Sequence, residues 1–223
     1  MGKKILITGG ASGKGLELVK ELAAQQSNQV YFTYCHSAGS ALQLMTAFKN
    51  TQGYRCDYTD DDSLSTFISR IHAVELDVVI HAAKAAVDAN TLSPALLHEK
   101  KFQTYLRPVI VITTELLKKF RQQQSGKIIT LLPSAVDSFT PATPLNYFAE
   151  NMYLLGLSRS WAIENAAYNI QSEVLSYPAT GSVHREAFRF NLNKLITEKS
   201  NFDEIGLNGS LVNEVVRRVE AWN

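Results

Sequence analysis

The sequence predicts an α/β fold, in which a doubly wound parallel sheet lies between two layers of helices. Short apolar runs alternate with helical patterns along the whole chain, which is typical of parallel sheets. Hydrophobic residues make up 45% of the 223 residues and charged residues 19%, so a large core can form. No Pro/Gly/Ser-rich linker, repeat or low-complexity run divides the sequence, and we expect a single domain over residues 1–223.

Six apolar runs have the length and composition of buried strands. They cover residues 3–8, 30–34, 54–56, 77–81, 126–132 and 170–177. The helical patterns begin at Leu16 and then cover residues 41–48, 64–71, 96–122, 147–167 and 211–222. Pro108 falls inside the longest of these patterns and is a candidate for an interruption, because proline breaks a helix interior.

The character of the chain changes after the last expected strand. Residues 182–206 are polar with scattered aromatic residues. In a doubly wound sheet, ligands bind outside the carboxyl ends of the strands, so this segment is well placed to cover a substrate. A surface excursion is the other interpretation, since long loops are either functional or mobile.

A glycine-rich turn joins the first expected strand to the first expected helix. Its pattern is Thr8-Gly9-x-x-x-Gly13-x-Gly15, with Ser12 and Lys14 at intervening positions. Glycines allow a tight turn and a close ligand approach, and a helix start offers free N–H donors and the positive end of a dipole. In this strand–turn–helix context the pattern indicates a phosphate-binding site.

Composition narrows the classes of partner. The net charge of +1 gives no reason to expect nucleic acid or an anionic membrane as a partner, and no apolar run is long enough to span a bilayer. Cys35 and Cys56 stand far apart without a CxxC pattern, so we expect neither a disulfide framework nor a metal site. A cytoplasmic location is the natural expectation.

With these elements in place, the chain resembles the short-chain dehydrogenase/reductase family, in particular its 3-oxoacyl-carrier-protein reductase branch, over about residues 1–178. Ser134 and Tyr147 match the family's catalytic serine and tyrosine, and they stand 13 residues apart, as in the family. The resemblance implies a Rossmann-like α/β/α fold. It also implies that the tyrosine hydroxyl gives a proton to a carbonyl oxygen held by the serine hydroxyl. Otherwise both are ordinary polar groups at a strand end and a helix start.

The resemblance also implies which residues surround a nicotinamide cofactor. Asp57, after the third strand, is expected at the adenine, although it also suits a polar turn. Tyr34 stands where NAD-preferring relatives carry an acid, and His36 and Ser37 can donate hydrogen bonds to a 2′-phosphate. NADP(H) is therefore expected in preference to NAD(H), with His36 as a plain surface histidine in the alternative. The expected cofactor-binding set is Thr8, Gly9, Ser12, Gly13, Lys14, Gly15, His36, Ser37, Asp57, His81, Ala82 and Pro178.

Four positions depart from the family pattern. Asn151 stands four residues after Tyr147, where the family has a lysine, and Tyr105 replaces a helical asparagine. Lys84 replaces the last glycine of an Asn-Asn-Ala-Gly motif, and Lys14 occupies the glycine turn. Without the lysine's charge nothing favours ionisation of the phenol, which suits proton donation and therefore reduction. We expect Asn151 and Lys84 at the catalytic centre, with Lys84 or Lys14 either a replacement cation or simply solvated.

Two classes of function follow. The first is an NADPH-dependent reductase of a 3-oxoacyl thioester or a similar carbonyl, free or carrier-bound. The second is a non-redox protein on the same fold: a nucleotide-binding sensor, a partner subunit, or a dehydratase, isomerase or cyclase that uses the same pocket. The sequence ends at Asn223 without the family's usual last strand, so we expect the tetramer contact of that strand to be lost. A homodimer through the helices at 96–122 and 147–167 is then the expected assembly.

Overall fold

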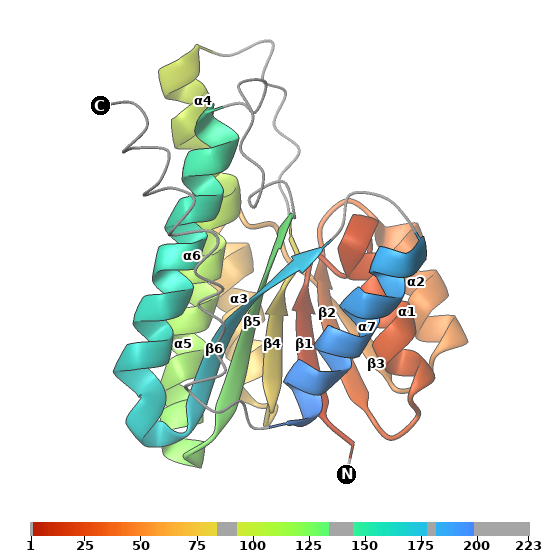
Figure 1. Cartoon of the computed structure of the whole chain (residues 1–223). Coiled ribbons are helices and arrows are strands. Elements are labelled where there is room, and N and C mark those ends of the chain that lie inside the picture. The colour runs from red at the N-terminus through yellow and green to blue at the C-terminus, as the bar shows by residue number, and fades with distance from the viewer. Residues whose placement is uncertain (1, 84–92, 134–144, 178–181, 199–223) are drawn as a thin grey trace.

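Six parallel strands form one sheet in the order β3-β2-β1-β4-β5-β6 (Figure 1). The computed structural model describes residues 2–83, 93–133, 145–177 and 182–198. The strands are β1 Lys4–Thr8, β2 Gln29–Tyr34, β3 Thr51–Arg55, β4 Val78–His81, β5 Gly126–Pro133 and β6 Ile170–Tyr177. All six expected strands are confirmed, with ends that differ by at most a few residues. The reversal of strand order beside β1 is the doubly wound topology that the sequence predicts.

Helices cover both faces of the sheet. They are α1 Gly13–Ala24, α2 Ala38–Ala47, α3 Asp61–His72, α4 Pro94–Lys101, α5 Arg107–Gln123, α6 Leu145–Asn165 and α7 Ser182–Thr197. One layer holds α1, α2 and α7, and the other holds α3, α5 and α6, while α4 projects beyond the carboxyl edge of the sheet (Figure 1). The expected three-layer α/β/α arrangement is confirmed.

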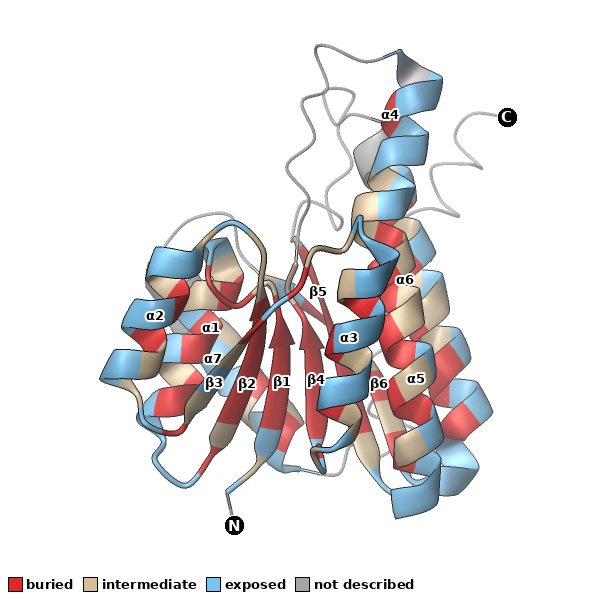
Figure 2. Cartoon of the chain, turned by 180° about the vertical axis from the view of Figure 1, so that it is seen from behind, coloured by how far each residue is buried: buried red, intermediate tan, exposed pale blue. Residues whose placement is uncertain are grey.

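Alternate residues of each central strand serve the two layers. In β1, Ile5 and Ile7 belong to the core beneath α1, α2 and α7, whereas Leu6 belongs to the core beneath α3, α5 and α6. Because both faces are covered, the strand reads as a continuous apolar run instead of an alternating one. Figure 2 shows the resulting buried residues along the strands and on the inward faces of the helices.

Pro108 does not interrupt the long helical region. The chain passes from α4 through a π-helical turn at Phe102–Leu106 directly into α5, where Pro108 lies in the first turn. A proline ring clashes with the carbonyl group four residues earlier in a regular α-helix. The wider π turn just before it relieves that clash, so the helix continues through the proline.

The segment that we expected to be either a lid or a surface excursion is instead a helix over Ser182–Thr197. Leu192 is 0% exposed and Ile196 6% exposed, and both pack into the core that α1 also covers. The sequence looked irregular there because the buried apolar residues that are described, Leu192 and Ile196, stand among polar ones. A lid over residues 182–206 stays a prediction.

Several expectations lie outside the described residues. They are the helix at 211–222, the missing last strand and the end of the 182–206 segment. Within the described parts of the chain, no helix is long and apolar enough to cross a membrane.

Lys127 of β5 holds the C-terminal end of α7 against the sheet. Its ammonium group donates hydrogen bonds to the carbonyl groups of Leu195 and Glu198, and its side chain is only 8% exposed. Lys127→Met should therefore lower the free energy of unfolding by about 1–3 kcal/mol, because buried carbonyl groups lose their donor. Lys118→Met is the matched control, since that lysine is 61% exposed in its ion pair and should cost under about 1 kcal/mol. Equal losses in urea denaturation would contradict this assignment.

His81 at the end of β4 makes stability depend on pH. Its Nε2 lies 2.8 Å from Thr113 Oγ1 of α5, and burial lowers the pKa of its imidazole to about 3. As the pH falls below about 6.5, the His81 imidazole binds a proton in the unfolded chain but stays neutral in the folded chain. Each pH unit down to about 3 should then cost about 1.4 kcal/mol of unfolding free energy. His81→Gln should flatten this slope in urea denaturation between pH 7 and 4.5, whereas His98→Gln, an exposed control, should not.

Candidate functional site

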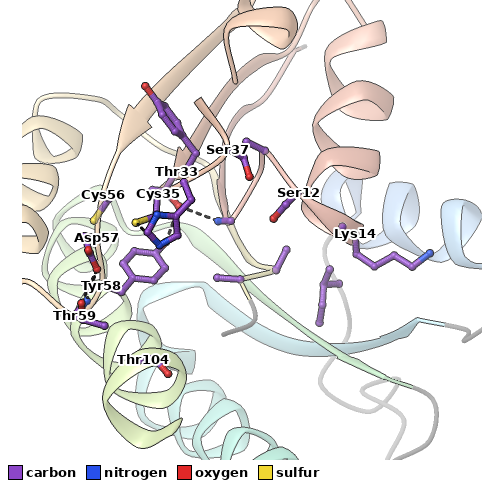
Figure 3. A pocket seen from close by; sticks show the side chains of 18 of the residues that line it. Ser12, Lys14, Thr33, Cys35, Ser37, Cys56, Asp57, Tyr58, Thr59 and Thr104 are labelled. Carbon is purple, nitrogen blue, oxygen red and sulfur yellow. Dashed lines mark hydrogen bonds between the residues drawn. The ribbon is translucent and has the colours of Figure 1, made fainter. Parts of the chain in front are cut away.

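A cavity of about 440 Å³ opens at the carboxyl edge of the sheet. Residues of β2, β5 and β6 contribute to its walls, as do the residues that follow β1, β2, β3 and β4 and two residues of α4 and the π-helical turn (Figure 3). Eight of the expected cofactor-binding residues line it: Gly9, Ser12, Gly13, Lys14, His36, Ser37, Asp57 and Ala82. The structure therefore brings together residues that the sequence spreads over more than seventy positions.

The glycine turn adopts a conformation that side chains would disturb. Gly9 and Gly13 have φ angles of +67° and +50°, in the left-handed region that favours glycine. A Cβ on Gly9 would lie 2.7 Å from Ala83 Cα, and one on Gly15 would lie 2.2 Å from the Gly9 carbonyl oxygen. A Cβ on Gly13 would meet nothing within 4 Å. Two of the glycines thus allow tight backbone packing, and the third leaves open space at the mouth of the turn.

The start of α1 offers its N–H groups to this open space. Ser12 is the N-cap residue, and its hydroxyl makes no capping hydrogen bond. The first turn of α1 carries no acidic residue, so nothing there repels an anion. Free N–H donors, the helix dipole and the glycine turn together fit the diphosphate of a dinucleotide. On this evidence the residues present suit such a cofactor.

Thr8 serves the site by holding backbone. Its hydroxyl oxygen accepts hydrogen bonds from the N–H groups of Ala82 at 3.1 Å and Ala83 at 3.3 Å, and the residue is 1% exposed. It ties the end of β1 to the residues that follow β4. Thr8 and Gly15 are not among the residues that line the cavity, so their contribution is to the shape of the turn.

His81 lies in the core and not against the cavity. Its imidazole is bonded to Thr113 of α5, it is 3% exposed, and it does not line the cavity. The lining of the cavity therefore gives no support to cofactor binding by His81, which stays a prediction. The physical reason is strand alternation: β4 directs His81 toward the α5 layer, while the cavity is reached by the next residues, Ala82 and Ala83.

A polar cluster forms the end of the cavity beside β2 and β3. Cys35 Sγ lies 3.5 Å from His36 Nε2, and burial raises the pKa of this thiol, with the Asp57 carboxylate adding to the rise. Asp57 itself accepts hydrogen bonds from the backbone N–H and the hydroxyl of Thr59 at 2.9 and 2.8 Å. These bonds lower the pKa of the Asp57 carboxyl, so a charged acceptor stands at this end.

Lys14 is engaged outside the cavity centre. Its ammonium group lies 3.0 Å from Glu17 Oε2, and it also lies 6.0 Å from the centre of the Tyr177 ring. Figure 3 shows its side chain extending away from Asp57 and Tyr58. The hypothesis that Lys14 replaces the missing catalytic cation is weakened by this pairing, because Glu17 offsets the charge.

The expected catalytic residues are only partly visible. Ser134, Lys84 and Pro178 lie outside the described residues. Tyr147 belongs to the first turn of α6, and Asn151 follows one turn later, where it is 2% exposed and engaged in contacts within the protein. The replacement of the family's lysine therefore puts a neutral, buried amide at that point of α6.

Nine residues that the sequence analysis did not single out also line the cavity: Ala11, Thr33, Tyr58, Thr59, Ala83, Lys100, Thr104, Leu131 and Tyr177. Thr33 and Tyr177 stand at or near the ends of β2 and β6. Because parallel strands end at one edge, their positions in the sequence could have placed them at the cavity. Thr104 faces the cavity from the π-helical turn, a feature frequent at functional sites. Tyr58 follows Asp57, and Lys100 precedes Thr104 by one turn.

Comparison with known proteins identifies the family of this chain. The family model for short chain dehydrogenases matches residues 3–189. The 3-oxoacyl-[acyl-carrier-protein] reductase MabA of Mycobacterium tuberculosis is 24% identical over 180 residues, covering 78% of this chain and 68% of the relative. The 2-dehydro-3-deoxy-D-gluconate 5-dehydrogenase of Pseudoalteromonas atlantica is 27% identical over 178 residues, covering 72% of this chain and 67% of the relative.

Solved structures share the fold. A short-chain dehydrogenase from Streptomyces avermitilis superposes with a TM-score of 0.76 at 18% identity, covering 100% of this chain and 97% of that one. ElxO with NADP bound superposes with a TM-score of 0.69 at 19% identity, covering 86% of this chain and 80% of that one. By its sequence and its strand order, this chain belongs to the short chain dehydrogenase family of NAD(P)-dependent oxidoreductases.

Proposed function

We propose that this protein is an NADPH-dependent reductase of a carbonyl compound, with Tyr147 as the proton donor and Ser134 orienting the carbonyl. The observation that carries the proposal is the cavity at the carboxyl edge, which joins an uncapped helix start at a glycine turn to the walls of an adenosine site. Such a cavity suits a dinucleotide laid across the strand ends. A bound nicotinamide would supply hydride to the carbonyl carbon.

The end of the cavity beside β2 supports NADP over NAD. Tyr34 ends β2 and Cys35 follows it, so the β2 end itself carries no carboxylate to repel a 2′-phosphate, and the Asp57 carboxylate at this end belongs to the residues after β3. His36 and Ser37 line the cavity there and can donate hydrogen bonds. Arg55 ends β3 in register with Tyr34, and its charge opposes the rise in the Cys35 pKa, so it lies near enough to add attraction.

The proposed chemistry runs toward reduction. A phenol with no neighbouring cation keeps its proton at neutral pH and can give it to a developing alkoxide. Among the described residues, Asn151 cannot supply the lost charge and Lys14 is paired with Glu17, while Lys84 lies outside them. Oxidation of an alcohol would need the phenol ionised at the start and is disfavoured. Asparagine at position 151 therefore slows proton transfer from the alcohol to Tyr147 more than proton transfer from Tyr147 to the carbonyl oxygen.

A 3-oxoacyl thioester is the proposed substrate class. Its support is the activity by which relatives such as MabA, a 3-oxoacyl-[acyl-carrier-protein] reductase, are named. Lys100 near the end of α4 lines the cavity, and its charge would attract an anionic carrier arm. A homodimer through α5 and α6 is proposed alongside, because α6 exposes the large apolar side chains of Tyr153 and Ile163.

A second candidate is a protein that binds the nucleotide without redox turnover. The substitution of the catalytic lysine by Asn151 and the pairing of Lys14 favour it, while the cofactor cavity remains built. One assay, of NADPH consumption, distinguishes the two candidate functions. A reductase consumes NADPH with a panel of 3-oxoacyl thioesters, whereas a sensor or partner subunit binds NADPH and leaves it unchanged.

Cofactor choice should follow the charge at the β2 end. We expect NADPH to bind at least about tenfold more tightly than NADH, as measured by fluorescence titration. His36→Asp should lower the ratio of NADPH affinity to NADH affinity by a factor of about ten, because it puts a carboxylate beside the 2′-phosphate. Gln26→Asp, an exposed change at the opposite end of α1, is the control and should leave the ratio alone. Equal affinity for both cofactors in the unmutated protein would refute the assignment.

Turnover should depend on one phenol. Tyr147→Phe is expected to lower kcat by about 10²–10⁴, the usual contribution of a positioned proton donor, while the NADPH affinity stays within about twofold. Ser134→Ala should lower kcat by about 10²–10³, as for the loss of one oxyanion donor. Tyr153→Phe changes a 44% exposed tyrosine of the same helix and should behave like the unmutated enzyme. Full activity of Tyr147→Phe in NADPH oxidation assays would rule out the proposed mechanism.

A further inference from the structure

A chain of three hydrogen-bonded groups links the glycine turn to the loop after β3. The Gly9 N–H donates to Thr33 Oγ1 at 2.8 Å, and that oxygen lies 2.5 Å from the Tyr58 hydroxyl oxygen (Figure 3). Gly9, Thr33 and Tyr58 all line the cavity. They come from three separate segments, at the ends of β1, β2 and β3, so the chain fixes these ends relative to one another.

Tyr58 has two distinct surfaces. Part of its ring packs against the core beneath α3, α5 and α6, and the residue as a whole is half-buried because another part lines the cavity. Its hydroxyl is the buried end: burial raises its pKa, and hydrogen bonding to Thr33 and Thr8 opposes that rise. A tyrosine held at both ring and hydroxyl has little freedom to turn.

Gly9 connects the hydrogen bond between Tyr58 and Thr33 to the turn that would contact a ligand. Its left-handed φ and its closeness to Ala83 leave the peptide few alternatives. Its N–H is already used by Thr33, and the Gly10 N–H donates to the Thr33 carbonyl oxygen at 2.8 Å. The first two N–H groups of the turn therefore hold the turn to β2. The N–H groups at the start of α1 are left for phosphate oxygens.

We propose that Tyr58 is a positioning residue for the cofactor: its hydroxyl fixes Thr33 and, through it, the glycine turn, while its ring forms a wall of the adenosine end. This inference rests on the proposed dinucleotide cofactor. Loss of the hydroxyl should loosen the turn and weaken ligands that place a diphosphate there. A ligand confined to the adenosine end still meets the ring and should be indifferent to the change.

The test compares two ligands in matched variants. NADPH reaches the glycine turn, whereas adenosine 2′-monophosphate carries no 5′-phosphate and stays at the adenosine end. Tyr58→Phe and Thr33→Val should each weaken NADPH by about tenfold, the loss expected for one hydrogen bond. Both should change the dissociation constant of adenosine 2′-monophosphate by less than about twofold. Because the two groups act in one chain, the double variant should lose little more than either single variant.

Two further variants separate positioning from general damage. Thr33→Ser keeps the hydroxyl and should restore NADPH affinity to nearly that of the unmutated protein. Tyr31→Phe removes a tyrosine hydroxyl from the core of the same sheet, away from the cavity, and should change neither affinity. Thermal unfolding of every variant, followed with and without NADPH, shows which proteins are folded at the temperature of the titration.

Each outcome decides the matter. Unchanged NADPH affinity in Tyr58→Phe, equal weakening of both ligands, or fully additive losses in the double variant would overturn the positioning role and leave the proposed function standing. Failure of the unmutated protein to bind NADPH would overturn the proposed function, and this inference with it. Should Tyr58→Phe fail to fold, Thr33→Val against Thr33→Ser gives the same decision.

Discussion

Two threonine hydroxyls hold the carboxyl end of β1 between its neighbours, and the shape of the site depends on them. Thr33 of β2 accepts the Gly9 N–H on one side, while Thr8 accepts two N–H groups from the residues after β4 on the other. Sheet hydrogen bonds end at this edge, so without these hydroxyls the backbone donors would point into the cavity unpaired. Because these backbone N–H groups bond to side-chain hydroxyls, the chain can turn away from the sheet directly after a strand and still satisfy its hydrogen-bond donors.

Much of the fold was predictable because buried parallel strands give continuous apolar runs. Residues such as Ile5, Leu6 and Ile7 carry that signal whatever their face, and all six strands were found. The α7 helix was missed because its buried face reduces to Leu192 and Ile196 in a polar segment. The π-helical turn before Pro108 was also missed, since a proline predicts a break and gives no hint of how a helix will avoid one.

The candidate site was predictable where position alone decides and not where side-chain direction decides. Glycines and residues at strand ends reach the cavity because parallel strands all end there. The direction of the His81 side chain was not predictable in this way, because a one-residue difference along a strand selects the opposite environment, and its imidazole lies against Thr113. Lys14 lines the cavity as expected, and its spacing from Glu17 already allowed the ion pair that the structure forms at 3.0 Å.

The cavity at the glycine turn and the proposed catalytic residues belong to different layers of the protein. The glycine turn, Ser12 and the residues after β2 are built on β1, β2 and the α1 layer, whereas Tyr147 and Asn151 belong to α6 in the opposite layer. The hydrogen bonds that shape the glycine turn do not involve α6. A substitution on α6, such as the proposed replacement of a lysine by Asn151, could therefore remove chemistry while the cavity at the glycine turn stays intact. Binding and turnover are separable properties in such an arrangement, so evidence for one is not evidence for the other.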